Sequence, residues 1–437
     1  MAMALQMFKE KKRRLLAGID LQDRFSQISF VYTDREEPVT VSGIVGSEQF
    51  NVPTVLAKRL EVNQWFYGKD ALKYASDGET VLIKDLLSLC LKEETVDIAG
   101  QSFDPVELLA LFIRRLLALL NNVTEGDKPY SLMITVERLD KTTINVLHKL
   151  AGRLSREADR IFFQSHMESF YDYMLYQPFE LWNGQVAVFE YSDRDMRTYR
   201  LTWNKNTTPV VAYIQEQEYP DMPYEILPEE TYAREQLAGR MDRRMGEIAE
   251  EVLGKERVAS CFLIGDGFLG DWCRESLKIL CQDRRVFQGN NLYSKGACLS
   301  LLRKLCPKPQ FEKYIFLGKD KVKANIGMFG GEKEKEEYYP ILDAGVNWFD
   351  ANKEWELLLE DSAELHFLIT PLNKGERQDV ILKLEGIPAR PEGFSRVRVG
   401  LLFDASNRCT IRVKDLGFGE YFKSSGLEWK DRLTWEE

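Results

Sequence analysis

Residues 15–32 have the sequence LLAGIDLQDRFSQISFVY, and the front of the chain is organised around them. The first part, 15–20, is a short apolar run, and the last part, 27–32, alternates between polar and apolar residues. Short runs of this kind, separated by polar residues, are typical of paired strands. We therefore predict a β-hairpin whose turn is formed by residues 20–26.

Helical and strand patterns alternate from this hairpin to residue 305. Apolar residues at helical spacing predict helices, and short apolar runs predict strands. The predicted helices are 105–121, 141–158, one that ends near Tyr176, 231–253, one that ends near Leu280, and 295–305; the predicted strands are 131–136, 161–163, 260–264 and a second hairpin of 185–190 and 197–203. Because the two hairpins occupy equivalent places, we predict an α/β fold with two similar halves.

The pattern changes at residues 307–309, Pro-Lys-Pro, because prolines interrupt helices. Short strands separated by turns then predict an antiparallel β-sandwich. The predicted strands are 356–359, 364–370, 380–384, 396–403 and 410–413, with turns such as 373–375 and 391–393. The run 332–337, EKEKEE, predicts a charged loop or a solvated strand edge.

The composition favours a folded, acidic protein. Hydrophobic residues make up 44% of the 437 residues, and the formal net charge is -10. An acidic surface disfavours nucleic-acid binding, since phosphates must be neutralised by Lys and Arg. The basic run 11–14 has two interpretations, contact with anionic lipid or nucleic acid and a solvated run before the first strand, and the second is favoured.

Cysteine usage and apolar runs bear on the compartment. The seven cysteines show no C-x-x-C spacing, so we predict no zinc site. Their odd number and the lack of a signal-peptide pattern favour the reducing cytoplasm. The longest apolar stretch, 105–120, is interrupted by three charged residues and is too short to span a bilayer, so we expect no membrane partner.

The back of the chain resembles a known β-domain. Residues 379–393, DVILKLEGIPARPEG, contain a strand followed by a Gly-Ile-Pro turn. Residues 410–415, TIRVKD, follow an aspartate-containing turn at 404–407, and a Gly-Glu-Arg turn lies upstream at 375–377. In combination these motifs resemble the peptide-binding β-domain of the seventy-kilodalton heat-shock chaperones.

Four motifs at the front resemble the ATPase domain of the same family, in the same order. They are GIDL at 18–21, MITV at 133–136, FLIGDG at 262–267 and YSKGAC at 293–298. The resemblance implies a shortened actin-like ATPase fold with duplicated, ribonuclease-H-like halves, followed by an all-β sandwich. The implied boundaries are 14–306 for the ATPase-like domain, 307–319 for a linker, 320–425 for the sandwich, and 426–437 for a C-terminal tail with no helical lid.

The same resemblance implies that the phosphate site is degenerate. In the family, glycines in two turns let backbone N–H groups approach the phosphates closely. The first turn here keeps Asp20 but continues as Gln22-Asp23-Arg24, and we expect Asp23 to place a negative charge at the phosphate position. The second turn, 190–195, has the sequence EYSDRD without a glycine, and the family's carboxylate near 164–167 is missing.

An active version of this site would use residues that the motifs assign. Asp20 would organise Mg²⁺, and Lys84 would be the catalytic lysine. The cofactor, ATP or ADP with Mg²⁺, would be bound by Gly18, Asp20, Gly265, Asp266 and Gly267. The Gly-Asp-Gly sequence is also a common structural turn. We assign no metal ligands among the side chains.

The favoured function is a chaperone-like protein that binds polypeptides or acts as a scaffold, with a pseudo-ATPase front that does not hydrolyse ATP. The resemblance places a peptide pocket around Met328, Phe329, Trp348 and Phe349. The interpretation that these residues are buried in the core of the sandwich has equal support. The alternative is an active ATP-dependent chaperone ATPase with altered phosphate turns. We expect a polypeptide or protein partner, no nucleic acid and no membrane, and a cytoplasmic location.

Overall fold

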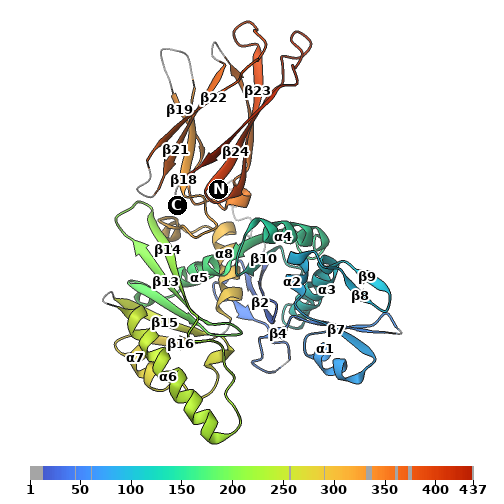
Figure 1. Cartoon of the computed structure of the whole chain (residues 1–437), viewed down its shortest axis with the longest axis vertical. Helices are drawn as coiled ribbons and strands as arrows, with labels where there is room; N and C mark the ends of the chain where they lie inside the picture. Colours follow the sequence, from blue (N-terminus) through green and yellow to red (C-terminus); the bar gives the residue numbers. More distant parts are fainter. Residues whose placement is uncertain are drawn as a thin grey trace, which may run out of the picture. The chain divides into compact units, whose positions relative to one another are not determined.

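The computed structural model describes residues 13–435 except 45, 61, 255–256, 290, 331–336, 360–362 and 373–375. The chain divides into two compact units, Met1–Tyr314 and Ile315–Glu437 (Figure 1). Three features of the sequence analysis fall outside the described residues: most of the charged run 332–337, the turn 373–375, and the first half of the basic run 11–14. Among the described helices, none is both long and apolar enough to cross a membrane.

The first sheet contains the predicted front hairpin. Its strand order is β11-β10-β1-β2-β3, with β4 also paired to β2. β1 and β2 are antiparallel, whereas β10 and β11 run parallel to β1. The bounds are β1 (Leu15–Leu21), β2 (Phe25–Tyr32), β3 (Val39–Thr40), β4 (Val52–Pro53), β10 (Ser131–Val136) and β11 (Arg160–Ser165). Every residue of β1 is buried, as its apolar sequence requires.

The second sheet repeats this arrangement. Its strands follow the order β16-β15-β12-β13-β14, with an antiparallel hairpin of β12 and β13 and parallel pairing of β15 with β12. The bounds are β12 (Gln185–Glu190), β13 (Met196–Asn204), β14 (Val210–Tyr219), β15 (Val258–Ile264) and β16 (Arg285–Gln288). Each sheet thus has a central strand whose hairpin partner lies on one side and whose parallel partner lies on the other.

Helices connect and cover these strands. They are α1 (Gly68–Tyr74), α2 (Leu86–Lys92), α3 (Pro105–Ala118), α4 (Lys141–Arg153), α5 (His166–Leu175), α6 (Thr231–Leu253), α7 (Glu275–Cys281), α8 (Leu292–Leu305) and α9 (Pro309–Glu312). The long helix α6 has the predicted bounds. The helix predicted directly after Gly267 begins only at Glu275, because a 3-10 turn at Asp266–Phe268 and an irregular segment come first.

Residues between β4 and α3 form small sheets for which the sequence analysis made no prediction. They are β5 (Leu56–Arg59), β6 (Trp65–Tyr67), β7 (Thr80–Ile83), β8 (Val96–Ile98) and β9 (Gln101–Phe103). β5 pairs with both β6 and β7, and β8 pairs with β9. A further short strand, β17 (Tyr314–Phe316), crosses the division between the two units.

The second unit consists of two four-stranded antiparallel sheets. The order β19-β18-β21-β22 forms one, called here the β18 sheet, and β20-β23-β24-β25 forms the other, called the β23 sheet. The bounds are β18 (Ala324–Gly330), β19 (Glu337–Leu342), β20 (Lys353–Leu359), β21 (Glu364–Pro371), β22 (Gln378–Lys383), β23 (Ser395–Ala405), β24 (Arg408–Asp415) and β25 (Glu428–Thr434). Burial alternates along β23 and β24, so one face of their sheet lies in the core.

The segment predicted as a tail at 426–437 contains a strand. β25 pairs with β24 from Lys414 opposite Glu428 to Arg408 opposite Thr434. Its residues are mostly charged and exposed, so the sequence there lacks the apolar alternation that predicts a strand. The described part of the chain therefore continues the sandwich to residue 434.

The Gly-Ile-Pro turn is held to the end of β24 by a buried ion pair. Arg390 donates from both Nη atoms to the carboxylate of Asp415, at 2.7 Å each, and the two side chains are 2% and 0% exposed. Ser425 also donates to Asp415 through its backbone N–H and its hydroxyl. Two loops at the same end of the sandwich are thereby fixed to one carboxylate.

Candidate functional site

A cleft of about 570 Å³, counted with its open mouth, lies between the two hairpin turns of the first unit. Its lining includes acids, amides and aromatic side chains from both sheets: Asp20, Gln22, Arg24, Phe25, Gln27, Asn51, Glu190, Ser192, Asp193, Ile264, Gly265, Asp266, Leu292 and Tyr293. Three of the predicted cofactor residues, Asp20, Gly265 and Asp266, are among them. The cleft is therefore the candidate site.

A buried ion pair lies at the base of the cleft. His166 Nε2 is 2.8 Å from Asp20 Oδ1, and the two side chains are 5% and 3% exposed. The His166 ring stacks on Tyr293 with 4.3 Å between ring centroids. Gln22 Nε2 donates to the other oxygen of Asp20 at 2.9 Å. Both carboxylate oxygens of Asp20 are thus engaged by the chain itself.

His166 is held there by the start of α5. Ser165 caps this helix by accepting a hydrogen bond from the Glu168 N–H, which fixes the following residue beside β1. Burial lowers the pKa of His166. The charge of Asp20, the hydrogen bond to Asp20 and the charge of Glu190 raise this pKa by more, so the net pKa is raised. These interactions favour the charged form of the imidazole beside Asp20.

Glu190 is close enough to His166 for the two charges to interact. Its Oε2 accepts a hydrogen bond from the Tyr199 hydroxyl at 2.9 Å. Burial raises the pKa of Glu190, and the nearby charge of His166 opposes this. Glu190 takes the place in the second hairpin that Asp20 takes in the first, so two carboxylates face one imidazole.

Arg24 crosses the mouth of the cleft to Asp266. Its Nη2 lies 2.7 Å from Asp266 Oδ2, and its guanidinium lies 5.4 Å from the centre of the Tyr224 ring. The predicted nucleotide residue Asp266 is thus bound to a cation of the first turn.

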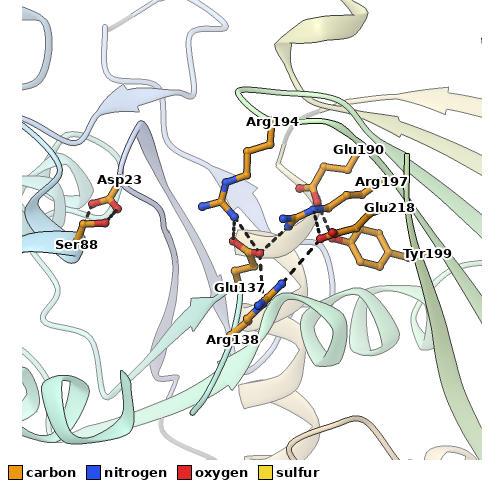
Figure 2. Close-up of polar contacts among 9 residues, drawn as sticks. All are labelled: Asp23, Ser88, Glu137, Arg138, Glu190, Arg194, Arg197, Tyr199 and Glu218. Atoms are coloured by element: carbon orange, nitrogen blue, oxygen red, sulfur yellow. Dashed lines mark hydrogen bonds and ion pairs between the residues drawn. The ribbon is translucent and has the colours of Figure 1, made fainter. Parts of the chain in front are cut away.

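The structure contradicts the expected position of Asp23. Its carboxylate accepts hydrogen bonds from the backbone N–H groups of Leu87 and Ser88 at 2.9 and 3.1 Å, and from the Ser88 hydroxyl at 2.6 Å (Figure 2). Asp23 therefore caps α2 and does not place its charge at the phosphate position. Asp85, the residue before α2, has φ 55° and makes no side-chain cap, so a distant carboxylate takes that role.

The glycines predicted to bind nucleotide are needed for packing within the chain. A Cβ on Gly267 would lie 2.4 Å from the Tyr191 ring, and a Cβ on Gly265 would lie 2.2 Å from the Tyr191 carbonyl oxygen. A Cβ on Gly18 would lie 2.4 Å from the Ser294 carbonyl oxygen at the start of α8. Tyr191 is fully buried, so the turn around Gly267 is filled by this side chain.

Lys84 does not belong to the site. It follows β7 with an exposed side chain and is not among the residues that line the cleft. The structure does not bring Lys84 together with the other predicted site residues, and its role as a catalytic lysine stays a prediction.

A second charged group, centred on Glu137, joins the two halves. Glu137, the residue after β10, is 2.9 Å from Arg194 Nη1 and 2.6 Å from Arg197 Nη1 (Figure 2). Arg197 also lies 3.1 Å from Glu218 on β14, and its side chain is 12% exposed. Burial raises the pKa of Glu137, but hydrogen bonding to Arg197 and the charge of Arg194 lower it more, so its net pKa is lowered.

These charges do not fit a magnesium-bound triphosphate. Four of the lining residues are acids, and Arg24 is the one cation among the described residues that line the cleft. Like charges a few ångströms apart repel by about 4 kcal/mol at an intermediate dielectric constant. Asp20, the expected partner of the magnesium shell, is already bound by His166 and Gln22. Within the described residues, no three or more His, Cys, Asp or Glu side chains gather as a metal-binding group.

The predicted peptide residues do not come together in one pocket. Met328 is 9% exposed and points into the sandwich, and Trp348 is 7% exposed in a 3-10 turn that follows β19. Val322 pairs with Val346 at the start of β18, and Met328 lies six residues further along the extended chain, roughly 20 Å away. Phe349 contacts Trp348 at that distant end.

Phe329 instead belongs to a row on the outer face of the β18 sheet. It pairs with Tyr338 on one side and His366 on the other, and His366 pairs with Ile381. Residues directly opposite on neighbouring strands point to the same face. Tyr338 is 43% exposed and Ile381 is 51% exposed, while Phe329 and His366 are half-buried. An apolar and aromatic row therefore crosses all four strands.

The outer face of the β23 sheet has a different character. Arg398 lies 2.8 Å from Glu356, and Arg412 lies 3.1 Å from Glu428, in ion pairs across neighbouring strands. The β23 sheet also exposes Leu358 and Leu402, and the β18 sheet also has an ion pair between Lys383 and Glu364, so the continuous aromatic row is what sets the β18 sheet apart.

Sequence reasoning missed His166, Glu137 and Arg197. Their partners are far away in the chain, and single histidines or arginines at such positions are indistinguishable from surface residues in the sequence. The acid of each turn was visible, but the side chain that would neutralise it was not.

Comparison with known families gives two matches. A model described as "Family of unknown function (DUF5716) C-terminal" matches residues 37–319, and one described as "Domain of unknown function (DUF8552)" matches residues 321–435. No curated protein matches the chain. The two matched regions meet close to the division between the compact units at residue 314.

Proposed function

The chain belongs to the DUF5716 C-terminal family, and we propose that this member binds polypeptide through its β-sandwich without hydrolysing ATP. In this proposal the front unit is a degenerate actin-like domain, as the heat-shock resemblance implies, and serves as a scaffold. The strand order shared by its two sheets supports that assignment.

The row formed by Tyr338, Phe329, His366 and Ile381 carries the proposal. It ends on Tyr338 of the edge strand β19 and on Ile381 of the edge strand β22. Edge strands offer free backbone groups to an extended polypeptide, and neighbouring apolar side chains provide contacts for its side chains. The β18 sheet is favoured as the binding surface because its aromatic row continues across all four strands.

The charges of the cleft support the absence of hydrolysis. Phosphoryl transfer requires cations and backbone donors around the phosphates and a metal ion held by carboxylates. Here Arg24 is bound to Asp266, and His166 is bound to Asp20. A nucleotide would have to break both interactions before it gained any of its own.

We expect hydrophobic peptides to bind without ATP and Ile381→Ser to weaken their binding about tenfold, or about 1.4 kcal/mol. A peptide array would identify a binder, and fluorescence anisotropy would give its affinity for each variant. Leu402→Ser is the matched control, because Leu402 is 41% exposed on the outer face of the other sheet. An array without signal, or equal losses in both variants, would contradict the proposal.

We expect Mg-ATP to bind weakly or not at all, because four acids line the cleft. Isothermal titration with Mg-ATP measures this directly. A dissociation constant below roughly 100 μM, equivalent to about 5.5 kcal/mol, would support the alternative of an active ATPase.

A further inference from the structure

The two hairpin turns of the first unit carry the same charges at the same positions. Arg24 lies four residues after Asp20, and Arg194 lies four residues after Glu190. In each hairpin the acid is paired with the residue seven positions later, so the two turns have the same length. Arg24 and Arg194 are therefore equivalent residues of the two halves.

The acids that face these arginines are equivalent as well. On the parallel strands, Thr135 of β10 pairs with Asp20, and Ile264 of β15 pairs with Glu190. Glu137 lies two residues past the first, and Asp266 lies two residues past the second. Each half thus presents one arginine from its hairpin turn and one acid from the end of its parallel strand.

The contacts between these residues are reciprocal. Arg24 of the first half is 2.7 Å from Asp266 of the second, and Arg194 of the second half is 2.9 Å from Glu137 of the first. We infer that these two ion pairs form a latch that sets the closure of the halves, in the place where a bound ligand would otherwise bridge them. The latch is built by the same pattern twice.

The two sides of the latch differ in strength. Arg197 adds a second arginine to Glu137 (Figure 2). The equivalent position of the first hairpin is Gln27. Arg197 is 12% exposed, and Glu218 pairs with it from β14. The Glu137 side thus has more charged partners, whereas the Arg24–Asp266 pair is the less exposed, with side chains 36% and 17% exposed against 58% and 35% for Arg194 and Glu137.

Salt acts on this latch without any ligand. The side chains of Arg24 and Arg194 are 36% and 58% exposed, and exposed ion pairs are weakened by added salt. The closure of the cleft is thus set by the chain's own charges and is graded by ionic strength.

Hydrogen–deuterium exchange with charge reversal tests the inference. The double variant Arg24→Asp/Arg194→Asp is expected to exchange at least threefold faster in peptides covering residues 18–27 and 188–197. The charge-swapped variant Arg24→Asp/Asp266→Arg is expected to return the first of these peptides to the wild-type rate. Arg240→Asp, which breaks an exposed 2.7 Å pair with Glu225 inside the second half, is the matched control and is expected to leave both peptides unchanged.

Wild-type exchange in the double variant, or faster exchange that the swap does not reverse, would overturn the latch. A measurement on the unaltered chain removes the dependence on correct folding of the variants. Raising NaCl from 0.05 to 1 M is expected to accelerate exchange in the two turns and to leave β18, a strand without charged residues, unchanged. Equal effects in both places would also overturn it.

Discussion

At the scale of single residues, His166 decides the character of the cleft. Its imidazole contacts Asp20 and stacks on Tyr293, and its surroundings exclude water. Buried ion pairs are costly to form, but removing one partner leaves an uncompensated charge that costs more. The charge of His166 therefore compensates the buried carboxylate of Asp20 and interacts with that of Glu190.

We expect the stability of the first unit to fall as the pH rises from 6 to 9. The pKa of His166 is raised in the folded state, so its contribution is complete below the ordinary value of about 6.5 and is lost as the pH rises through the folded pKa. Urea unfolding at a series of pH values measures this. The double variant Asp20→Asn/His166→Gln lacks both charges, and a fall equal to that of the wild type would contradict the assignment.

At the scale of secondary-structure elements, carboxylates from distant loops fix the ends of helices and turns. Asp23 caps α2 from the β1–β2 turn, and Asp415 holds the Gly-Ile-Pro turn from the end of β24. In both cases the carboxylate provides hydrogen-bond partners that the local sequence does not supply. The sequence predicted these elements better than it predicted what holds them.

Asp23→Ala is expected to lower the free energy of unfolding of the first unit by about 1 to 2 kcal/mol, because α2 loses its cap. Asp193→Ala is the matched control, since Asp193 is the equivalent residue of the second turn and is exposed. That change is expected to stay within about 0.5 kcal/mol. Chemical denaturation monitored by circular dichroism compares the two variants, and equal losses would refute the capping role.

Arg390→Leu is expected to destabilise the second unit by about 3 kcal/mol, because it leaves Asp415 buried without its cation. Hydrogen bonding to Arg390 lowers the pKa of Asp415, so this stabilisation is present above the ordinary carboxyl pKa and is lost only in strong acid. Arg398→Leu removes an ion pair whose arginine is 44% exposed and serves as the control. Thermal melts of the two variants measure both effects, and the loss for Arg398→Leu is expected to stay below about 1 kcal/mol.

At the scale of the whole molecule, the sequence predicted what depends on local periodicity. Helix α6 has the predicted bounds, and both hairpins are present. It failed where a partner lies far along the chain. The sequence predicts Asp23 in the cleft because its partner, α2, begins some sixty residues later. It predicts a tail at 426–437 because the exposed charges of β25 show no apolar alternation.

The candidate site was predictable only in part. The lost glycines of the turns and the added acids were visible in the sequence, and Asp20, Gly265 and Asp266 do line one cleft. The side chains that neutralise those acids come from other elements, and no local pattern points to them. Alternation along β18 places Met328 inside and Phe329 outside, which separates two residues that the resemblance had grouped.

The doubled charge pattern has an evolutionary consequence. A substitution of Arg24 alone leaves Asp266 without that cation, whereas a paired change to neutral residues leaves no charge unmatched. Inheritance should therefore couple positions 24 and 266, and likewise positions 194 and 137, so that relatives keep both members of a pair or neither. A substitution at one of these positions would then persist only together with a compensating substitution in the other half.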